Sequence, residues 1–342
     1  MDEDLQLLIK EPLVSIIIPL YNAEKFIADT IQSALSQTWK NIEIIVVDDD
    51  STDGSLAIAK KFEAKGVQVL HQKNSGASAA RNKGLSISKG KYIQFLDADD
   101  FITENKIEEQ LIVLKDLPNH LGLCATVYFF DGEDPFQQKP IHEWYGIDTD
   151  DTADFIIKLY GGPIVGQTFG GMIQPNAWLT PRTIIDRAGG WDESLSLDDD
   201  GEFFCRIMLA ADGIRYTTAP VNYYRKFRKG SNLSAKKDRK AAESMVKVID
   251  LKHRYLLEAI PQERPLIDQI MARHYLSAAA NLYPSHKDIV NRCLQVAKSL
   301  GYTKIDYEGG TPGKLFSKIF GWKLTKDFGY ISRWIKGKIN TL

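Results

Sequence analysis

Four short apolar runs, separated by segments of helical spacing, occupy the first hundred residues. Runs of this length that are rich in β-branched residues are typical of strands buried on both faces of a parallel sheet. The runs are Val14 to Leu20, Ile42 to Val47, Val67 to Leu70 and Tyr92 to Leu96. Helices are predicted at 23–37, from an N-cap at Thr52 or Asp53 to about Ala64, and at 76–88. This alternation predicts right-handed βαβ units, and therefore an α/β fold with a mainly parallel central sheet flanked by helices.

The pattern is looser after residue 100, where we expect a second half of mixed elements at 101–234. Its predicted elements are a strand at 122–130, a long loop at 131–152, an extended segment at 176–180, a helix from near Pro181, an acidic helix at about 200–210, and strands near Arg215 and Val221. Residues 235–300 show helical periodicity, broken around Pro261, Pro265 and Pro284, which predicts a helical C-terminal region. A separate tail follows at 301–342.

Composition and charge narrow the class of protein. The 342 residues are 44% hydrophobic and 26% charged with a net charge of −2, which indicates an ordinary globular protein without a nucleic-acid partner. The three cysteines, Cys124, Cys205 and Cys293, lack CxxC spacing and fit a reducing compartment. No apolar run approaches the roughly 20 residues that span a bilayer, and the first residues lack the pattern of a signal peptide. We therefore expect a cytoplasmic protein.

Acidic residues follow two of the predicted parallel strands. Asp48-Asp49-Asp50 comes after the second strand and Asp97-Ala98-Asp99-Asp100 after the fourth. Ligands of open parallel sheets bind at the carboxyl ends of the strands. Carboxylates on alternate residues can bind a hard cation that also holds phosphate oxygens, and the cation would neutralise a departing diphosphate. The alternative is that these residues only form turns and cap helices.

Three further positions carry candidate chemistry. Tyr21 follows the first strand and can stack on a nucleobase, or can simply pack in the fold. Arg81 lies in the helix after Asn74-Ser75-Gly76, either near a diphosphate or as a surface charge. The run Asp198-Asp199-Asp200 begins a helix, where a carboxylate can serve as a general base. Its alternative is an acidic first turn favoured by the helix dipole.

Together these motifs resemble glycosyltransferase family 2, the inverting enzymes with a GT-A fold. The matching stretches are VSIIIPLYNAEKFIADTIQSALSQT, IEIIVVDDDSTDGS, NSGASAARNKGLSISKGKYIQFLDADD, GGWDESLSLDDDGEFFCR and YYRKFRKGSNLS, which cover roughly residues 14–234. The resemblance implies that residues 1–234 form a GT-A catalytic domain, with a donor half at about 12–100 and an acceptor half at 101–234.

The resemblance also implies roles for individual residues through their places in these motifs. It assigns donor binding to Pro19, Tyr21, Asp48, Asp49, Arg81, Asp97, Ala98 and Asp99. In the DxD motif Asp97-Ala98-Asp99, Asp97 faces the ribose and Asp99 binds a divalent cation, Mn²⁺ or Mg²⁺. Asp200 is the catalytic base, preceded by Asp199. The implied donor is a nucleotide-diphosphate sugar, most commonly a UDP sugar, and the implied acceptor is a hydroxyl of a glycan or lipid-linked glycan.

The chain departs from the family pattern at one place. Many members carry a histidine two residues after the YR pair, whereas Tyr224-Arg225 is followed here by Lys226 and Phe227. Arg225, Arg228 or Lys229 could neutralise phosphate instead, and the coordination of the metal is left open. Trp178 and Trp191 precede the base and could contact the acceptor, although a core role is equally compatible with the sequence.

The tail at 301–342 interleaves Trp, Phe and Ile with Lys and Arg. This pattern is typical of a helix on an anionic membrane, which would make the protein peripheral at the inner face. The alternative is a terminal helix that packs on the protein with a solvated basic face. The sequence leaves both open.

Three other functions compete with sugar transfer. A sugar-nucleotide pyrophosphorylase would need a glycine-rich basic loop after the first strand, where this chain has Tyr21-Asn22-Ala23-Glu24. A Rossmann dehydrogenase would need GxGxxG at the same place. A catalytically silent protein that keeps the GT-A fold for binding or scaffolding stays open, because the usual histidine is missing.

Overall fold

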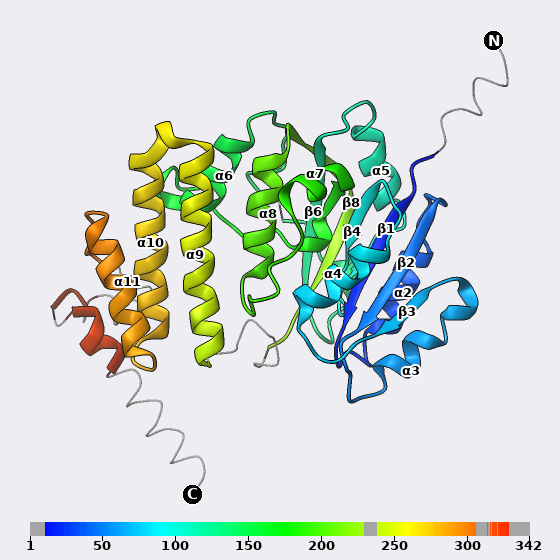
Figure 1. Ribbon diagram of the computed structural model, residues 1–342, viewed down its shortest axis with the longest axis horizontal. Coiled ribbons are helices and arrows are strands. Elements are labelled where there is room, and N and C mark those ends of the chain that lie inside the picture. The colour runs from blue at the N-terminus through cyan, green and yellow to red at the C-terminus, as the bar shows by residue number, and fades with distance from the viewer. Residues whose placement is uncertain are drawn as a thin grey trace, which may run out of the picture. The chain divides into compact units, whose positions relative to one another are not determined.

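The computed structural model describes residues 11–141, 143–228 and 238–305, and near the C-terminus residues 313, 315, 317–319 and 321–327. The chain divides into two compact units, Met1–Leu233 and Ser234–Leu342 (Figure 1). The first unit contains the sheet and every candidate site residue named above, so the site is built within one unit.

Within the described residues, the first unit is organised around an eight-stranded mixed sheet of order β3-β2-β1-β4-β7-β6-β8-β5. The strands are β1 Val14–Leu20, β2 Ile42–Asp48, β3 Gln68–His71, β4 Tyr92–Phe95, β5 Phe101–Ile102, β6 His120–Phe130, β7 Trp178–Pro181 and β8 Gly213–Lys226. The first four strands are mutually parallel, whereas β7 runs antiparallel to β4 and to β6. The α/β fold with a parallel first half is therefore confirmed.

Helices cover both faces of the parallel strands because the strands are apolar on both sides. On one face α2 (Ile27–Leu35) and α3 (Ser55–Lys60) pack against Ile16, Ile18 and Val46. On the other face α4 (Ala77–Ile87) packs its Ala80 against Ile45 and Val47. Gly84 permits this approach, because a Cβ there would lie 2.5 Å from Cγ2 of Ile17. The N-cap of α3 is Gly54, one residue beyond the predicted Asp53, although the Asp53 carboxylate still accepts the Ser55 N–H at 2.9 Å.

The second half of the first unit differs from the sequence prediction in four elements, β8, β5, α5 and α6. Residues 213–226 form one strand, β8, where two strands were expected. Its pairing with β6 jumps from Thr217 to Val221, and Pro220, which cannot donate to a β ladder, lies in the bulge. The sequence did not predict β5 or the two helices α5 (Lys106–Val113) and α6 (Thr152–Gly161). The predicted helices near Pro181 and Asp200 are confirmed as α7 (Arg182–Ala188) and α8 (Asp199–Ala210).

The second unit contains three long helices in the described range 238–305, as its periodicity predicted. They are α9 Arg239–Ala259, α10 Arg264–Leu282 and α11 Lys287–Ser299. Pro265 does not break a helix but lies in the first turn of α10, where the missing N–H leaves no bond unmade. Most of the basic and aromatic tail, including Lys314, Phe316 and residues 328–342, lies outside the described residues. Among the helices that the structure does describe, none has the length and apolar character needed to cross a membrane.

Candidate active site

The candidate donor residues follow three adjacent strands. In the order β2-β1-β4, Asp48 ends β2 and Asp49 follows it, Tyr21 follows β1, and the Asp97 motif follows β4. The register pairs Leu20 with Asp48 at the carboxyl ends of β1 and β2. The strand order reverses at β1, the position where α/β sheets bind ligands. The structure therefore brings both acidic clusters to one edge of the sheet.

Arg81 of α4 connects the two halves of the domain. Its guanidinium donates to Asp97 Oδ1 at 2.8 Å and to Asp199 Oδ2 at 3.0 Å. The Ser78 hydroxyl donates to the same Asp199 oxygen at 2.7 Å. Burial acts to lower the pKa of Arg81, but the two carboxylates outweigh it and hold that pKa above its usual value. The buried, ionised Arg81 thus holds Asp97 of the DxD motif and Asp199 at the start of α8 through one guanidinium group.

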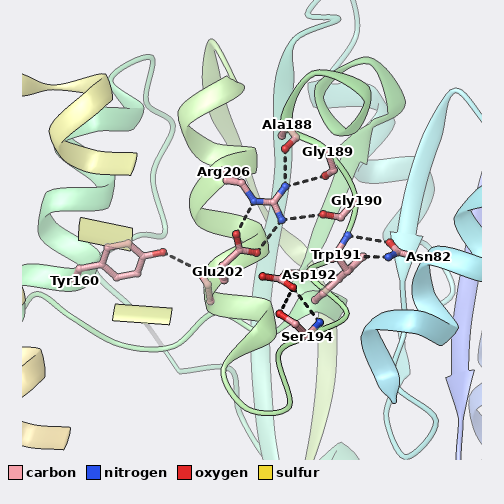
Figure 2. A network of polar contacts seen from close by, with 11 residues as sticks. Asn82, Tyr160, Ala188, Gly189, Gly190, Trp191, Asp192, Ser194, Glu202 and Arg206 are labelled. Carbon is pink, nitrogen blue, oxygen red and sulfur yellow. Dashed lines mark hydrogen bonds and ion pairs between the residues drawn. The ribbon is translucent and has the colours of Figure 1, made fainter. Parts of the chain in front are cut away.

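The Trp191 ring packs against the Arg81 guanidinium. The guanidinium lies 4.3 Å from the centre of the indole ring, and the indole also stacks on Phe203 of α8 at 4.1 Å. The Asn82 side chain holds the Trp191 backbone on both sides, accepting its N–H and donating to its carbonyl, each at 2.9 Å (Figure 2). The sequence left open whether Trp191 contacts the acceptor or packs in the core, and the sequence analysis gave Asn82 no role. In the structure the Trp191 ring is buried between Arg81 and Phe203.

A second set of contacts fixes the segment before α8. Figure 2 shows Arg206 donating to three successive carbonyls, those of Ala188, Gly189 and Gly190. The same guanidinium pairs with the buried Glu202 carboxylate at 2.7 Å. Since Glu202 and Arg206 lie on α8, the helix that carries Asp200 is tied to the Trp191 segment and through it to α4.

Asp200 lies half-buried in the first turn of α8. Burial raises its pKa to about 7, and the charges of Asp198 and Asp199 add to this effect, while Arg81 opposes it. Its Oδ1 accepts the Gly201 N–H at 2.9 Å. A carboxyl group whose pKa lies near 7 is suited to exchanging protons with a hydroxyl group at neutral pH. Asp198, just before the helix, has a left-handed backbone with φ of 57°.

The carboxylates after β4 are crowded. Burial and the nearby charge of Asp97 raise the pKa of Asp99 to about 6. Burial and both neighbouring acids raise the pKa of Asp100 well above its usual range. Asp100 accepts hydrogen bonds from the Asn176 amide and from the Arg225 backbone N–H, and Asn176 Oδ1 accepts the Asp97 N–H at 2.8 Å. Asn176 thus holds both Asp97 and Asp100. The sequence analysis assigned no role to this residue.

The acids suit a divalent cation that takes part of its coordination from a ligand. Within the described ranges no group of three or more His, Cys, Asp or Glu side chains is arranged to hold a metal alone. Mg²⁺ and similar cations commonly bind through one or two carboxylates together with waters and substrate phosphates. Asp97 and Asp99 are hard oxygen donors of this kind, and burial together with the nearby charge of Asp97 raises the pKa of Asp99. The donor set therefore fits Mg²⁺ or Mn²⁺.

The acids after β2 are held by the protein itself. Asp49 accepts from the Ser75 and Gly76 N–H groups and from the Gln72 amide, each at 2.8 Å. Gly76 adopts φ of +96°, a conformation that side chains rarely take, so the loop can present its N–H to Asp49. Asp48 is fully buried. The Tyr21 ring, by contrast, is 47% exposed beside them.

The remaining candidates have structural partners. The Arg225 guanidinium lies between the Phe26 and Phe129 rings and donates to the Asp99 carbonyl at 2.9 Å and to Asp131 at 3.1 Å. Arg228 is exposed and pairs with Glu133. Trp178 is buried and stacks on Phe204 at 5.4 Å. Ala98 is buried, and Pro19 is half-buried within β1. Lys229 lies outside the described residues.

Comparison with known proteins relates this site to one family. The family model described as Glycosyl transferase family 2 matches residues 15–174. An uncharacterised glycosyltransferase of Rickettsia prowazekii is 36% identical over 202 residues, which are 58% of this chain and 59% of that protein. The chain spans about half the length of the curated relatives it matches.

Two solved structures share the fold. S. aureus TarS in complex with UDP-GlcNAc has a TM-score of 0.66 and 21% identity, covering 84% of this chain and 81% of that one. The mannosyltransferase PcManGT from Pyrobaculum calidifontis, in complex with GDP-Man and Mn²⁺, has a TM-score of 0.53 and 15% identity, covering 92% and 83%. At these identities the likeness concerns the fold, which is that of the GT-A enzymes.

Proposed function

The chain belongs to glycosyltransferase family 2 through its N-terminal domain, and from this premise we propose that it is a metal-assisted inverting enzyme with Asp200 as its base. The observation that carries the proposal is the bridge made by Arg81. It pairs with Asp97 of the DxD motif and with Asp199, the neighbour of Asp200. The buried Arg81 guanidinium therefore links the proposed donor-binding motif to the helical turn that carries the proposed base.

The proposed reaction is a single in-line displacement. Asp200 takes the proton of an acceptor hydroxyl, whose oxygen forms a bond to the anomeric carbon while the bond to the diphosphate breaks on the opposite face. A divalent cation held by Asp99 and Asp97 would supply neutralising charge for the diphosphate. Arg81 fixes Asp97 and Asp199, and the Trp191 ring beneath it keeps the guanidinium in place. Asp199, already bound by Arg81 and Ser78, orients the first turn of α8.

The proposed donor is a nucleotide-diphosphate sugar, with UDP as the first nucleotide to test. Fold neighbours have been solved with UDP-GlcNAc, with UDP and with GDP-Man, which supports this class of donor without fixing its sugar. The proposed acceptor is a hydroxyl of a glycan or lipid-linked glycan. Tyr21, half exposed at the end of β1, is available to stack on the base.

A lipid-linked acceptor would be met at a membrane, and the composition of the 301–342 tail suits a cytoplasmic protein that binds the inner face. Flotation of the full chain and of a chain ending at residue 305 with vesicles of anionic and of neutral lipid tests this. Preferential flotation of the full chain with anionic vesicles is expected. Equal partitioning of the two proteins would exclude a membrane role for the tail.

Calorimetric titration with UDP, GDP and dTDP, with and without Mn²⁺, tests the donor site, and release of nucleotide from UDP sugars tests turnover. Asp99→Ala should lose metal-dependent binding. Asp200→Asn should keep nucleotide binding but lose turnover by orders of magnitude, as loss of a general base requires. Asp154→Asn, on the exposed side of α6, is the matched control. Activity that survives in Asp200→Asn would exclude Asp200 as the base. A folded protein that binds no nucleotide with metal present would instead indicate a catalytically silent scaffold.

A further inference from the structure

Lys106, the first residue of α5, is a buried cation that the proposed mechanism does not use. Its ammonium group donates to Gln94 Oε1 at 2.5 Å and to Gln110 Oε1 at 2.6 Å. Neither glutamine carries a charge that compensates for the ammonium, and burial lowers the pKa of Lys106 to about 8. Burial also raises the pKa of the Cys124 thiol, so that group stays neutral. A buried charge among neutral partners costs folding free energy.

The ammonium determines how both glutamine amides are oriented. An ammonium only donates hydrogen bonds, so each amide turns its oxygen toward Lys106 and its NH₂ group away from it. The Gln94 amide donates to the Asn176 carbonyl at 3.0 Å, and the Gln110 amide donates to the Ala177 carbonyl at 3.0 Å. Through these two amides, Lys106 fixes the backbone of two successive residues in one short turn.

This turn carries the side chain that holds the DxD motif. Asn176 is fully buried. Its Oδ1 accepts the Asp97 N–H at 2.8 Å, and its Nδ2 donates to the Asp100 carboxylate. A continuous chain of buried hydrogen bonds therefore runs from Lys106 through the glutamines and Asn176 to both ends of the motif. A shift of the turn would displace the groups that hold Asp97 and Asp100.

We propose that Lys106 is a positioning residue of the donor site, which holds the DxD motif in place by orienting the two glutamines that fix the Asn176 turn. This inference rests on the proposed function, because it takes the motif to bind a divalent cation and a diphosphate. An apolar side chain of similar length would fill the same space without the cost of a buried charge. It would also leave both glutamine oxygens without their donor, and the amides would then be free to rotate and release the turn.

Calorimetric titration with UDP at a fixed Mn²⁺ concentration tests the role of Lys106. Lys106→Met keeps most of the length of the side chain and removes its donors and its charge. This variant should bind UDP with Mn²⁺ about tenfold more weakly than wild type, a loss commonly seen when a group that orients metal-binding residues is removed.

Gln37→Leu is the matched control. Gln37 is also fully buried, and it holds the start of the same helix, because its Oε1 accepts the Ile107 N–H at 3.1 Å. Its amide donates to the carbonyls of Ser33 and Thr103 and not to the turn that carries Asn176. Gln37→Leu should therefore lose thermal stability but keep its affinity for UDP with Mn²⁺.

Two further measurements test whether Lys106 acts through Asn176. Lys106→Met combined with Asn176→Ala should bind UDP with Mn²⁺ no more weakly than Asn176→Ala alone, since residues of one network do not act additively. In the protein without ligands, the Asp97 amide should exchange its hydrogen several-fold faster in Lys106→Met than in wild type or Gln37→Leu. Lys106→Gln, which keeps N–H donors on a shorter side chain, should show smaller losses and replaces Lys106→Met if thermal melts show that the latter is unfolded.

The outcomes separate this inference from the proposed function. Wild-type affinity in folded Lys106→Met, or an equal loss of affinity in Gln37→Leu, overturns the positioning role and leaves the donor site intact. Additive losses in the double variant, or unchanged exchange at the Asp97 amide, also overturn it. Failure of the wild type to bind any nucleotide with Mn²⁺ overturns the proposed function and with it the role of Lys106 in donor binding.

Discussion

Replacement of Asp200 by Asn is expected to stabilise the folded protein at alkaline pH while it abolishes sugar transfer. Burial, together with the charges of Asp198 and Asp199, raises the pKa of Asp200 from 3.8 to about 7. Between these values the folded state keeps a proton that the unfolded chain has released. The contribution of Asp200 to stability therefore falls as the pH rises from about 4 to about 7.

The size of the effect follows from the shift. About three pKa units, each worth about 1.4 kcal/mol, mean that ionised Asp200 costs the folded state up to about 4 kcal/mol above pH 7. Asn has nearly the same shape without the charge, and its Oδ1 can still accept the Gly201 N–H. The advantage of the variant over wild type should therefore grow by about 3 kcal/mol from about pH 5 to about pH 8, and then level off.

Urea unfolding of both proteins at several pH values across this range measures the difference directly. Asp154→Asn is the control, because that carboxylate is exposed on α6, where it pairs with Lys158 at 2.6 Å, so no growing advantage is expected there. A difference between wild type and Asp200→Asn that stays constant with pH would refute the reasoning. It would show that the surroundings of Asp200 do not oppose its ionisation, and would remove the physical support for a base that titrates near neutrality.

Three further expectations concern the same edge of the sheet. The kcat/KM of wild type should rise with pH through about 7, because Asp200 must lose its proton to act as a base; a rate profile flat over that range would contradict this. Arg81→Lys should lower turnover about a hundredfold with the fold retained, since one ammonium cannot reproduce the paired contacts to Asp97 and Asp199, as steady-state kinetics would measure. Asn176→Ala should reduce the free energy of unfolding by about 3 kcal/mol in urea, because the Asp97 N–H and the Asp100 carboxylate each lose a partner.

The parallel half of the fold could be predicted because its strands are apolar on both faces. Val14–Leu20 and Ile42–Asp48 are short continuous apolar runs, and turn residues mark their ends. The antiparallel half carries weaker signals. The two residues of β5 are too few to show a period, and the bulge before Val221 hides the continuity of β8. The local pattern of apolar residues indicates that a strand is buried on both faces. It does not indicate which strand, distant in sequence, pairs with it in the sheet.

The sequence could predict which acids gather at the edge, because parallel strands bring their carboxyl ends together. It could not predict how those acids are held. Asn176 lies nearly eighty residues after Asp97 and hydrogen-bonds to it across β4 and β7. Asn82 hydrogen-bonds to Trp191, 109 residues further along the chain. Such contacts depend on tertiary packing, so the partner of a single amide side chain, whether it lies inside a motif like Asn82 or outside one like Asn176, cannot be inferred from local pattern.

The distribution of charge explains why a metal and a donor would bind this site together. Burial and the charges of neighbouring carboxylates raise the pKa values of Asp99 and Asp100. The Arg81 guanidinium already pairs with both Asp97 and Asp199. A diphosphate alone would add negative charge to this edge, and a cation alone would lack the phosphate oxygens that complete its coordination. Each ligand therefore supplies what the other needs, and by linkage each should raise the affinity of the other by the same factor. On the proposed function, an edge that is electrostatically unfavourable when empty would in this way be selective for the complete metal–nucleotide pair.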